Sequence, residues 1–136
     1  DMAWAPMADH HSALKYEFQE LLLVALGAVP GALLRWLVAL HLRDQNLLVN
    51  VFGATLLGLL VSLPVAPRYQ LCLGIGFCGS LTTFSGLMLA AIKHLNSGDW
   101  AAACGLIGLT LGLGLGGAGL GMQLSQWIKW NHPKRE

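Results

Sequence analysis

The sequence is poor in charged residues. Only 11% of its 136 residues are Asp, Glu, Lys or Arg, while 55% are hydrophobic. A soluble domain carries about a quarter charged residues because its surface must be wetted. This composition therefore excludes an ordinary soluble domain and predicts an exterior that faces lipid. The net charge of +1 is also too small to indicate nucleic acid or an acidic protein as a partner.

Residues that would indicate disulfides, metal sites or enzymatic chemistry are scarce as well. The three cysteines lie in apolar runs without disulfide or metal-ligand spacing, and we interpret them as reduced packing residues: Cys72, Cys78 and Cys104. The adjacent His10 and His11 lie in a polar segment and are interpreted as solvated side chains rather than metal ligands. No motif for nucleotide hydrolysis is present, and we do not expect an enzyme.

What the sequence does contain is four long runs without charge. A helix needs about 20 residues to cross a hydrocarbon core about 30 Å thick. In lipid the backbone must satisfy its own hydrogen bonds, and these runs are too long for barrel strands, so each is predicted to be a helix. The predicted fold is an all-α integral membrane protein with four transmembrane helices, at residues 21–41, 46–66, 70–93 and 100–128.

Polar segments flank this membrane domain. Residues 1–20 are predicted to form a polar N-terminal segment, residues 21–130 the four-helix membrane domain, and residues 131–136 a polar tail. A short surface helix is expected around residues 14–20, with disorder before it. Four crossings place the N-terminus, the second connection and the C-terminus on one side of the membrane.

Basic residues are almost balanced between the two sides. One side would hold Lys15, Arg68, Lys129, Lys134 and Arg135, and the other Arg43 and Lys93. Without Lys129, Lys134 and Arg135 near the C-terminus, each side holds two basic residues, so the positive-inside bias is slight. A slight bias suits insertion in both orientations, and hence an antiparallel dimer. Four helices are also too few to enclose a wide pore alone, so we expect oligomerisation.

Small residues are concentrated in the fourth span. Its glycines include three pairs spaced four apart: Gly108/Gly112, Gly112/Gly116 and Gly117/Gly121. Glycine at this spacing lets two helix backbones approach closely, where van der Waals contact and weak CαH···O bonds hold them. The pattern fits packing within one chain and packing between chains equally well.

Few polar side chains lie inside the spans, and none is acidic. The absence of an embedded carboxylate counts against a proton-coupled exporter of the small multidrug type. Arg35, near the end of the first span, either snorkels to the interface or gives an anion vestibule a fixed positive charge. Asn50 in the second span either bonds across helices or donates its amide to a small anion.

The third span carries the most unusual pattern. Residues 76–85 read GFCGSLTTFS and place glycines and hydroxyls in the middle of a crossing. Such residues accompany a broken helix whose freed backbone groups line an ion site, although a kinked helix with hydroxyl back-bonding is the simpler alternative. Carbonyls freed at Gly79 and Thr82 would suit sodium. The hydroxyls of Thr83 and Ser85, with the ring edge of Phe84, would suit an anion.

These motifs resemble the CrcB/Fluc family of fluoride channels. The matching features are the Gly31 and Arg35 pair, the Asn50 and Gly53 pair, and above all residues 76–85, within a likeness that covers roughly residues 21–128. The resemblance implies passive export of fluoride across the inner (plasma) membrane, which relieves fluoride toxicity. It also implies an antiparallel homodimer with two fluoride pathways and a third helix broken in mid-membrane.

The resemblance assigns roles to individual residues. Asn50 and Phe84 would contact fluoride, with Thr83, Ser85 and Arg35 along the pathway. The backbone carbonyls of Gly79 and Thr82 would hold a structural sodium ion at the centre of the dimer.

The chain departs from the family pattern at several positions. The motif usually continues to Thr-Phe, whereas Gly86 and Leu87 follow Ser85 here, so the second pore phenylalanine is missing. Thr110 is nearly the only hydroxyl of a fourth span that usually carries a polar track, and Asn46 stands where Thr is common. A divergent chain of this kind could instead form one half of a heterodimeric fluoride channel.

Overall fold

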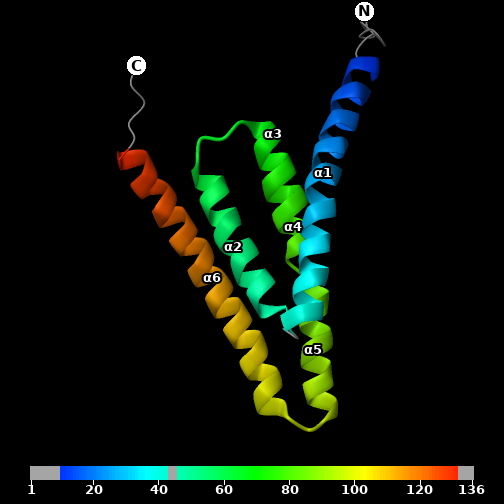
Figure 1. Cartoon of the computed structure of the whole chain (residues 1–136), viewed down its shortest axis with the longest axis vertical. Coiled ribbons are helices and arrows are strands. Elements are labelled where there is room, and N and C mark those ends of the chain that lie inside the picture. The colour runs from blue at the N-terminus through cyan, green and yellow to red at the C-terminus, as the bar shows by residue number, and fades with distance from the viewer. Residues whose placement is uncertain (1–9, 43–45, 132–136) are drawn as a thin grey trace, which may run out of the picture.

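The computed structural model describes residues 10–42 and 46–131, and these are almost entirely helical (Figure 1). The elements in chain order are α1 (His10–Leu42), α2 (Leu47–Ser62), α3 (Pro67–Tyr69), η2 (Gln70–Cys78), α4 (Gly79–Leu81), α5 (Phe84–Asn96) and α6 (Trp100–Asn131). The predicted all-α class is therefore confirmed. The predictions for residues 1–9, for Arg43 and for residues 132–136 lie outside the described residues.

Three helical stretches are long and apolar enough to cross a membrane: Leu14–Leu42, Pro67–Asn96 and Trp100–Asn131. The second predicted span is shorter than expected, because α2 ends at Ser62 rather than at residue 66. Its 16 residues rise about 24 Å, less than a hydrocarbon core of about 30 Å. The residue before a proline avoids the helical region, and Leu63 before Pro64 is accordingly extended (φ −81°, ψ 146°).

The polar N-terminal segment is not separate from the first span. We expected a short surface helix around residues 14–20, followed by a span from residue 21. Instead α1 runs without interruption for 33 residues from His10. Its residues 14–20 are exposed, and no proline or glycine lies between His10 and Gly27 to interrupt the helix.

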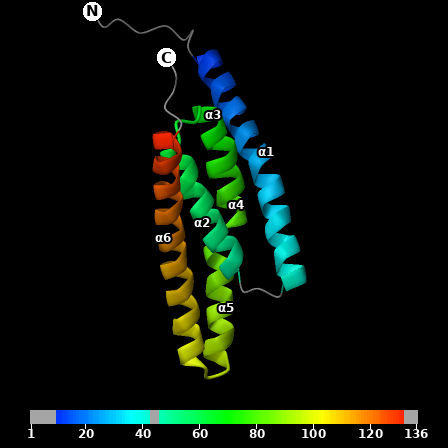
Figure 2. The same cartoon turned by 60° about the vertical axis from the view of Figure 1, so that its left-hand side comes forward.

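Two ends of the molecule are defined by the helix arrangement. The start of α1, the connection from α2 to α3 and the end of α6 lie at one end, and the turn between α5 and α6 lies at the other (Figures 1 and 2). This is the grouping that four crossings predict. α2 packs against α6 and η2, while α1 packs along η2 and α4. α5 packs against the first half of α6, next to the turn that joins them (Figures 1 and 2).

Glycines in α2 and α6 bring these two helices into close contact. A Cβ on Gly58 would lie 2.9 Å from the backbone Cα and C of Ala118, and Gly117 and Gly121 pack against Thr55 and its neighbours in α2. Around Gly112, in contrast, a Cβ would meet nothing within 4 Å. Only the Gly117/Gly121 pair therefore serves packing within the chain, and the Gly108/Gly112/Gly116 face stays open.

We expect Gly58→Ala to destabilise the protein, because the new methyl group would push against the backbone of α6. Overpacking of this kind costs about 2 kcal/mol. Denaturant unfolding in detergent measures the loss, and Gly112→Ala, with open space around it, is the matched control. Equal unfolding curves for the two variants would contradict the α2–α6 packing described above.

Candidate functional site

Two threonines interrupt the helical stretch from Pro67 to Asn96. α4 ends at Leu81, Thr82 (φ −78°, ψ 151°) and Thr83 (φ −148°, ψ 120°) are extended, and α5 begins at Phe84. β-branched residues suit an extended backbone. Thr83 also caps α5, because its Oγ1 accepts a hydrogen bond of 3.1 Å from the Gly86 N–H. Gly79, where we predicted a freed carbonyl, itself has helical angles, so the interruption is confined to Thr82 and Thr83.

The side chain of Asn50 bridges this interruption from α2. Its Nδ2 donates to the Thr83 carbonyl at 3.1 Å, and its Oδ1 accepts from the Thr83 N–H at 2.7 Å. These two bonds fix the orientation of the amide, because the carbonyl needs a donor and the N–H an acceptor. Among the described residues, no acceptor takes the second N–H of Nδ2. Asn50 thus makes the bond across helices that was one of its two predicted roles.

Two helix N-termini meet at the same place. α2 begins at Leu47 and α5 at Phe84, and the Asn50–Thr83 bridge joins them near their starts. The N-terminal end of a helix carries a partial positive charge from its aligned peptide dipoles. Where half-helices end inside a membrane, such positive ends face anions. The electrostatics at the interruption therefore favour an anion beside Asn50 and Thr83.

A crevice of about 330 Å³ opens between α2, the interruption, α5 and α6. Its wall brings together four residues singled out above and a fifth from α6: Asn50, Thr82, Thr83, Phe84 and Thr110. The ring of Phe84 is 69% exposed although it is large and apolar. The crevice therefore offers an amide, a hydroxyl and an aromatic ring to one small ligand.

Two residues of the crevice wall, Leu87 and Thr110, are positions at which the chain departs from the family pattern. Leu87 lines the crevice but is only 2% exposed, so its side chain belongs to the core as much as to the wall. Thr110 is 4% exposed, and its Oγ1 donates to the Leu106 carbonyl at 2.7 Å. We did not predict Thr110 as a site residue, although its position as a nearly isolated hydroxyl in the fourth span was a usable signal.

Backbone carbonyls near the interruption suit a hard cation. Because the Thr83 N–H donates to Asn50, the Gly79 carbonyl loses its usual helical partner four residues ahead. A Cβ on Gly79 would meet nothing within 4 Å, so the space around it is open. Carbonyl oxygens are ligands that hard cations accept. Within residues 10–42 and 46–131, no group of three His, Cys, Asp or Glu side chains offers an alternative metal site.

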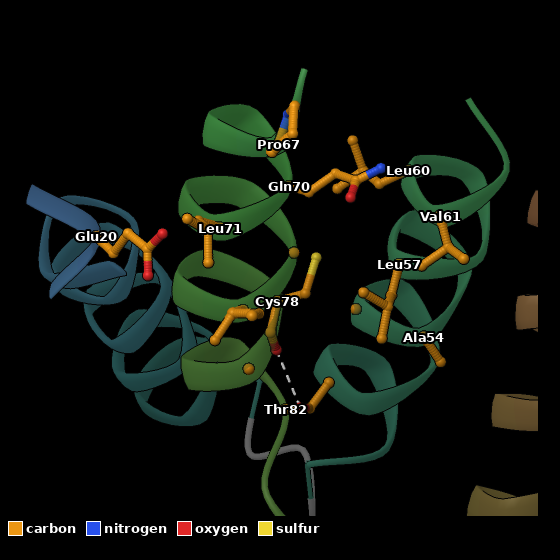
Figure 3. A pocket seen from close by; sticks show the side chains of 14 residues that line it. Glu20, Ala54, Leu57, Leu60, Val61, Pro67, Gln70, Leu71, Cys78 and Thr82 are labelled. Atoms are coloured by element: carbon orange, nitrogen blue, oxygen red, sulfur yellow. Dashed lines mark hydrogen bonds between the residues drawn. The ribbon is translucent and has the colours of Figure 1, made fainter. Parts of the chain in front are cut away.

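Gly79 and Thr82 also line a larger groove of about 760 Å³ between α2 and the η2–α4 stretch (Figure 3). Most of its lining is apolar, with Leu57, Leu60 and Leu71 among the labelled side chains, and Gln70 is polar. Glu20 of α1 borders it as well. We predicted no carboxylate inside a span, and Glu20 lies within the apolar stretch Leu14–Leu42, where its side chain is exposed.

The remaining predicted residues lie apart from the crevice wall. Ser85 is exposed, with its Oγ 3.3 Å from Thr83 Oγ1, so it connects to the crevice through that hydroxyl. Arg35 is half-buried on α1, one turn beyond Gly31, which packs against Ser80 and Phe77. Among the described residues, none forms a hydrogen bond or ion pair with the Arg35 guanidinium.

The sequence is similar to those of several named proteins. The chain is 69% identical over 123 residues to fluoride-specific ion channel FluC 2 of Parasynechococcus marenigrum (strain WH8102), covering 90% of this chain and 93% of that protein. It is 41% identical over 100 residues to fluoride-specific ion channel FluC 1 of a strain of Prochlorococcus marinus, covering 71% of this chain and 77% of that protein.

A more distant relative, fluoride-specific ion channel FluC of Acinetobacter baumannii (strain ACICU), is 34% identical over 125 residues, covering 84% of this chain and 99% of that protein. The family model described as "CrcB-like protein, Camphor Resistance (CrcB)" matches residues 22–122, which include the interruption and every residue of the crevice wall. The chain belongs to the CrcB family of membrane proteins.

Proposed function

We propose that the protein is a fluoride channel that lets the anion leave the cell passively and so relieves fluoride toxicity. The observation that carries the proposal is the Asn50–Thr83 bridge, which holds a spare amide N–H beside Phe84 where two helix N-termini meet. The names of the relatives support fluoride as the ion. The proposed location is the plasma membrane of the cell.

The chemistry of the crevice explains a preference for fluoride. Fluoride is small and strongly hydrated, so a pore must offer close hydrogen-bond donors in place of water. The free N–H of Asn50 and the hydroxyl of Thr83 supply donors, and the positive ring edge of Phe84 adds attraction without a proton. Chloride is larger and more weakly hydrated, and it gains less from the same donors.

A second copy of the chain completes the proposed channel. The groove in Figure 3 and the open glycine face of α6 are surfaces that an antiparallel copy can cover. In this arrangement the interruption at Thr82 and Thr83 lies at mid-membrane, and the two copies form two fluoride pathways.

Sodium is the proposed structural cation of this dimer. Two copies would bring the carbonyls of Gly79 and Thr82 together around one ion, and this oxygen donor set fits sodium. The ion would hold the two interruptions against each other. Elemental analysis of the purified dimer after long dialysis against sodium-free buffer is expected to find one sodium per two chains, and its complete loss would contradict the site.

A heterodimer is the second candidate. The relatives carry the numbered names FluC 1 and FluC 2, which favours paired chains in some cells. A specialised half-channel would contribute fewer groups to the pathway. This chain has a buried Leu87 in place of a ring, and Thr110 is the only hydroxyl that its fourth span brings to the crevice wall.

Liposomes that contain only this purified chain separate the two candidates. We expect rapid fluoride efflux, followed with a fluoride electrode, because one chain carries every group of the crevice. A folded dimer that passes no fluoride alone, but does so after a FluC 1 chain is added, would favour the heterodimer.

A further inference from the structure

Asn46 and Gly86 fit each other at the start of α2. A Cβ on Gly86 would lie 2.8 Å from Nδ2 and 3.2 Å from Cγ of Asn46, and 2.9 Å from Cγ2 of Thr83. Contacts under 3.0 Å essentially never occur for a real Cβ. In this arrangement the Asn46 amide occupies the space that a side chain at position 86 would enter. These are two of the positions at which the chain departs from the family pattern, and the structure places them in contact.

The backbone holds Asn46 in an unusual conformation. Its φ is 65°, in the left-handed region that asparagine tolerates better than most residues. Its carbonyl accepts a hydrogen bond of 3.1 Å from the Asn50 N–H, while its side chain makes no cap bond to α2. Asn46 directly precedes α2 and stands four residues before Asn50 in the sequence.

The amide of Asn46 is half-buried and has donors to spare. Among the described residues, no protein group forms a hydrogen bond with this side chain, although it lies against the turn that carries Thr83 and Ser85. An amide in such a place either contacts a ligand or water, or fills space only. Asn50, one turn away, keeps its own spare N–H for the crevice.

We propose that Asn46 is a second amide donor on the fluoride pathway, and that Gly86 is the residue that makes room for it. The anion would pass between the Asn46 amide and the Thr83–Ser85 hydroxyls on its way to or from Asn50. This role rests on the proposed function. It offers fluoride an extra donor in a chain that has Leu87 in place of a second ring.

The decisive variant is Asn46→Asp. Aspartate keeps the size of asparagine and tolerates the same backbone, and the positive end of α2 favours its charge. Thermal stability of the dimer should therefore be unchanged. Fluoride efflux should fall at least tenfold, because a donor is lost and a negative charge faces the anion. Wild-type efflux from this variant would overturn the role, since a space-filling residue would tolerate the change.

The contact between Asn46 and Gly86 is tested by measuring the melting temperature of variants. Gly86→Ala should lower the melting temperature, because the new Cβ overlaps the Asn46 amide and Thr83 Cγ2, and Asn46→Ala/Gly86→Ala should recover the part of the loss that comes from Asn46. The double variant should still carry fluoride about tenfold more slowly than wild type, since its donor is missing. Gly105→Ala, where a Cβ meets nothing within 4 Å, is the matched control.

The outcomes separate this inference from the function on which it rests. No efflux from the wild-type protein would overturn the proposed function and this role together. If the wild-type protein transports fluoride and Asn46→Asp transports it at the same rate, only the role of Asn46 is overturned. An unchanged melting temperature for Gly86→Ala would overturn the close contact between Asn46 and Gly86.

Discussion

Asn50→Asp is expected to stop fluoride efflux almost completely. The carboxylate loses the donor that holds the Thr83 carbonyl at 3.1 Å and the spare N–H that faces the ligand. It also places a negative charge beside the path of an anion. Repulsion between unit charges about 4 Å apart is about 4 kcal/mol at an effective dielectric constant of about 20. This corresponds to a slowing of about a thousandfold, measured as the initial rate of efflux from liposomes.

Asn131→Asp is the matched control for this change. It makes the same substitution at an exposed position at the end of α6, far along the chain from the crevice. We expect its efflux to equal that of the wild type. Size-exclusion chromatography of both variants shows whether the dimer is intact. An intact Asn50→Asp dimer that transports fluoride at the wild-type rate would refute the role assigned to the bridge.

Phe84→Ile is expected to lower fluoride efflux at least tenfold. Isoleucine preserves an apolar side chain at the crevice wall but has no positive ring edge to attract the anion. A cation over a ring face gains about 2 kcal/mol when desolvated, and an attraction of the same order between the anion and the positive ring edge would change the rate more than tenfold. Because Phe84 is 69% exposed in the single chain, the substitution should disturb its core little.

The same substitution at Phe52 controls for the loss of a ring. Phe52 is 55% exposed on α2 and lies outside the crevice wall. Phe52→Ile should therefore transport at close to the wild-type rate. Equal losses in the two variants would mean that the ring of Phe84 acts through general packing rather than through contact with the ion.

The sequence predicts the helices well because charge alone locates them. An apolar run between charged residues must be helical in lipid, and the structure has helices in all four runs. The boundaries depend on local chemistry that the charge map does not contain. Pro64 ends α2 early, while the polar residues from His10 to Glu20 continue α1 because nothing in them interrupts a helix.

The site is predicted less completely because its contacts join distant parts of the chain. Asn50 and Thr83 were both singled out, but the two hydrogen bonds between them span 33 residues, and no local pattern predicts which helix faces the interruption. The contact between Asn46 and Gly86 was invisible for the same reason. The glycine spacing of α6 is a third case, since Gly108/Gly112 and Gly117/Gly121 have identical spacing but face different surroundings.

Selectivity tests the central claim most directly. Liposomes that contain only this purified chain are loaded with equal concentrations of fluoride and chloride, and the efflux of each ion is followed with its own electrode. The donors and the ring around the crevice predict rapid loss of fluoride and chloride loss no faster than from protein-free liposomes. Comparable efflux of the two ions would contradict the account.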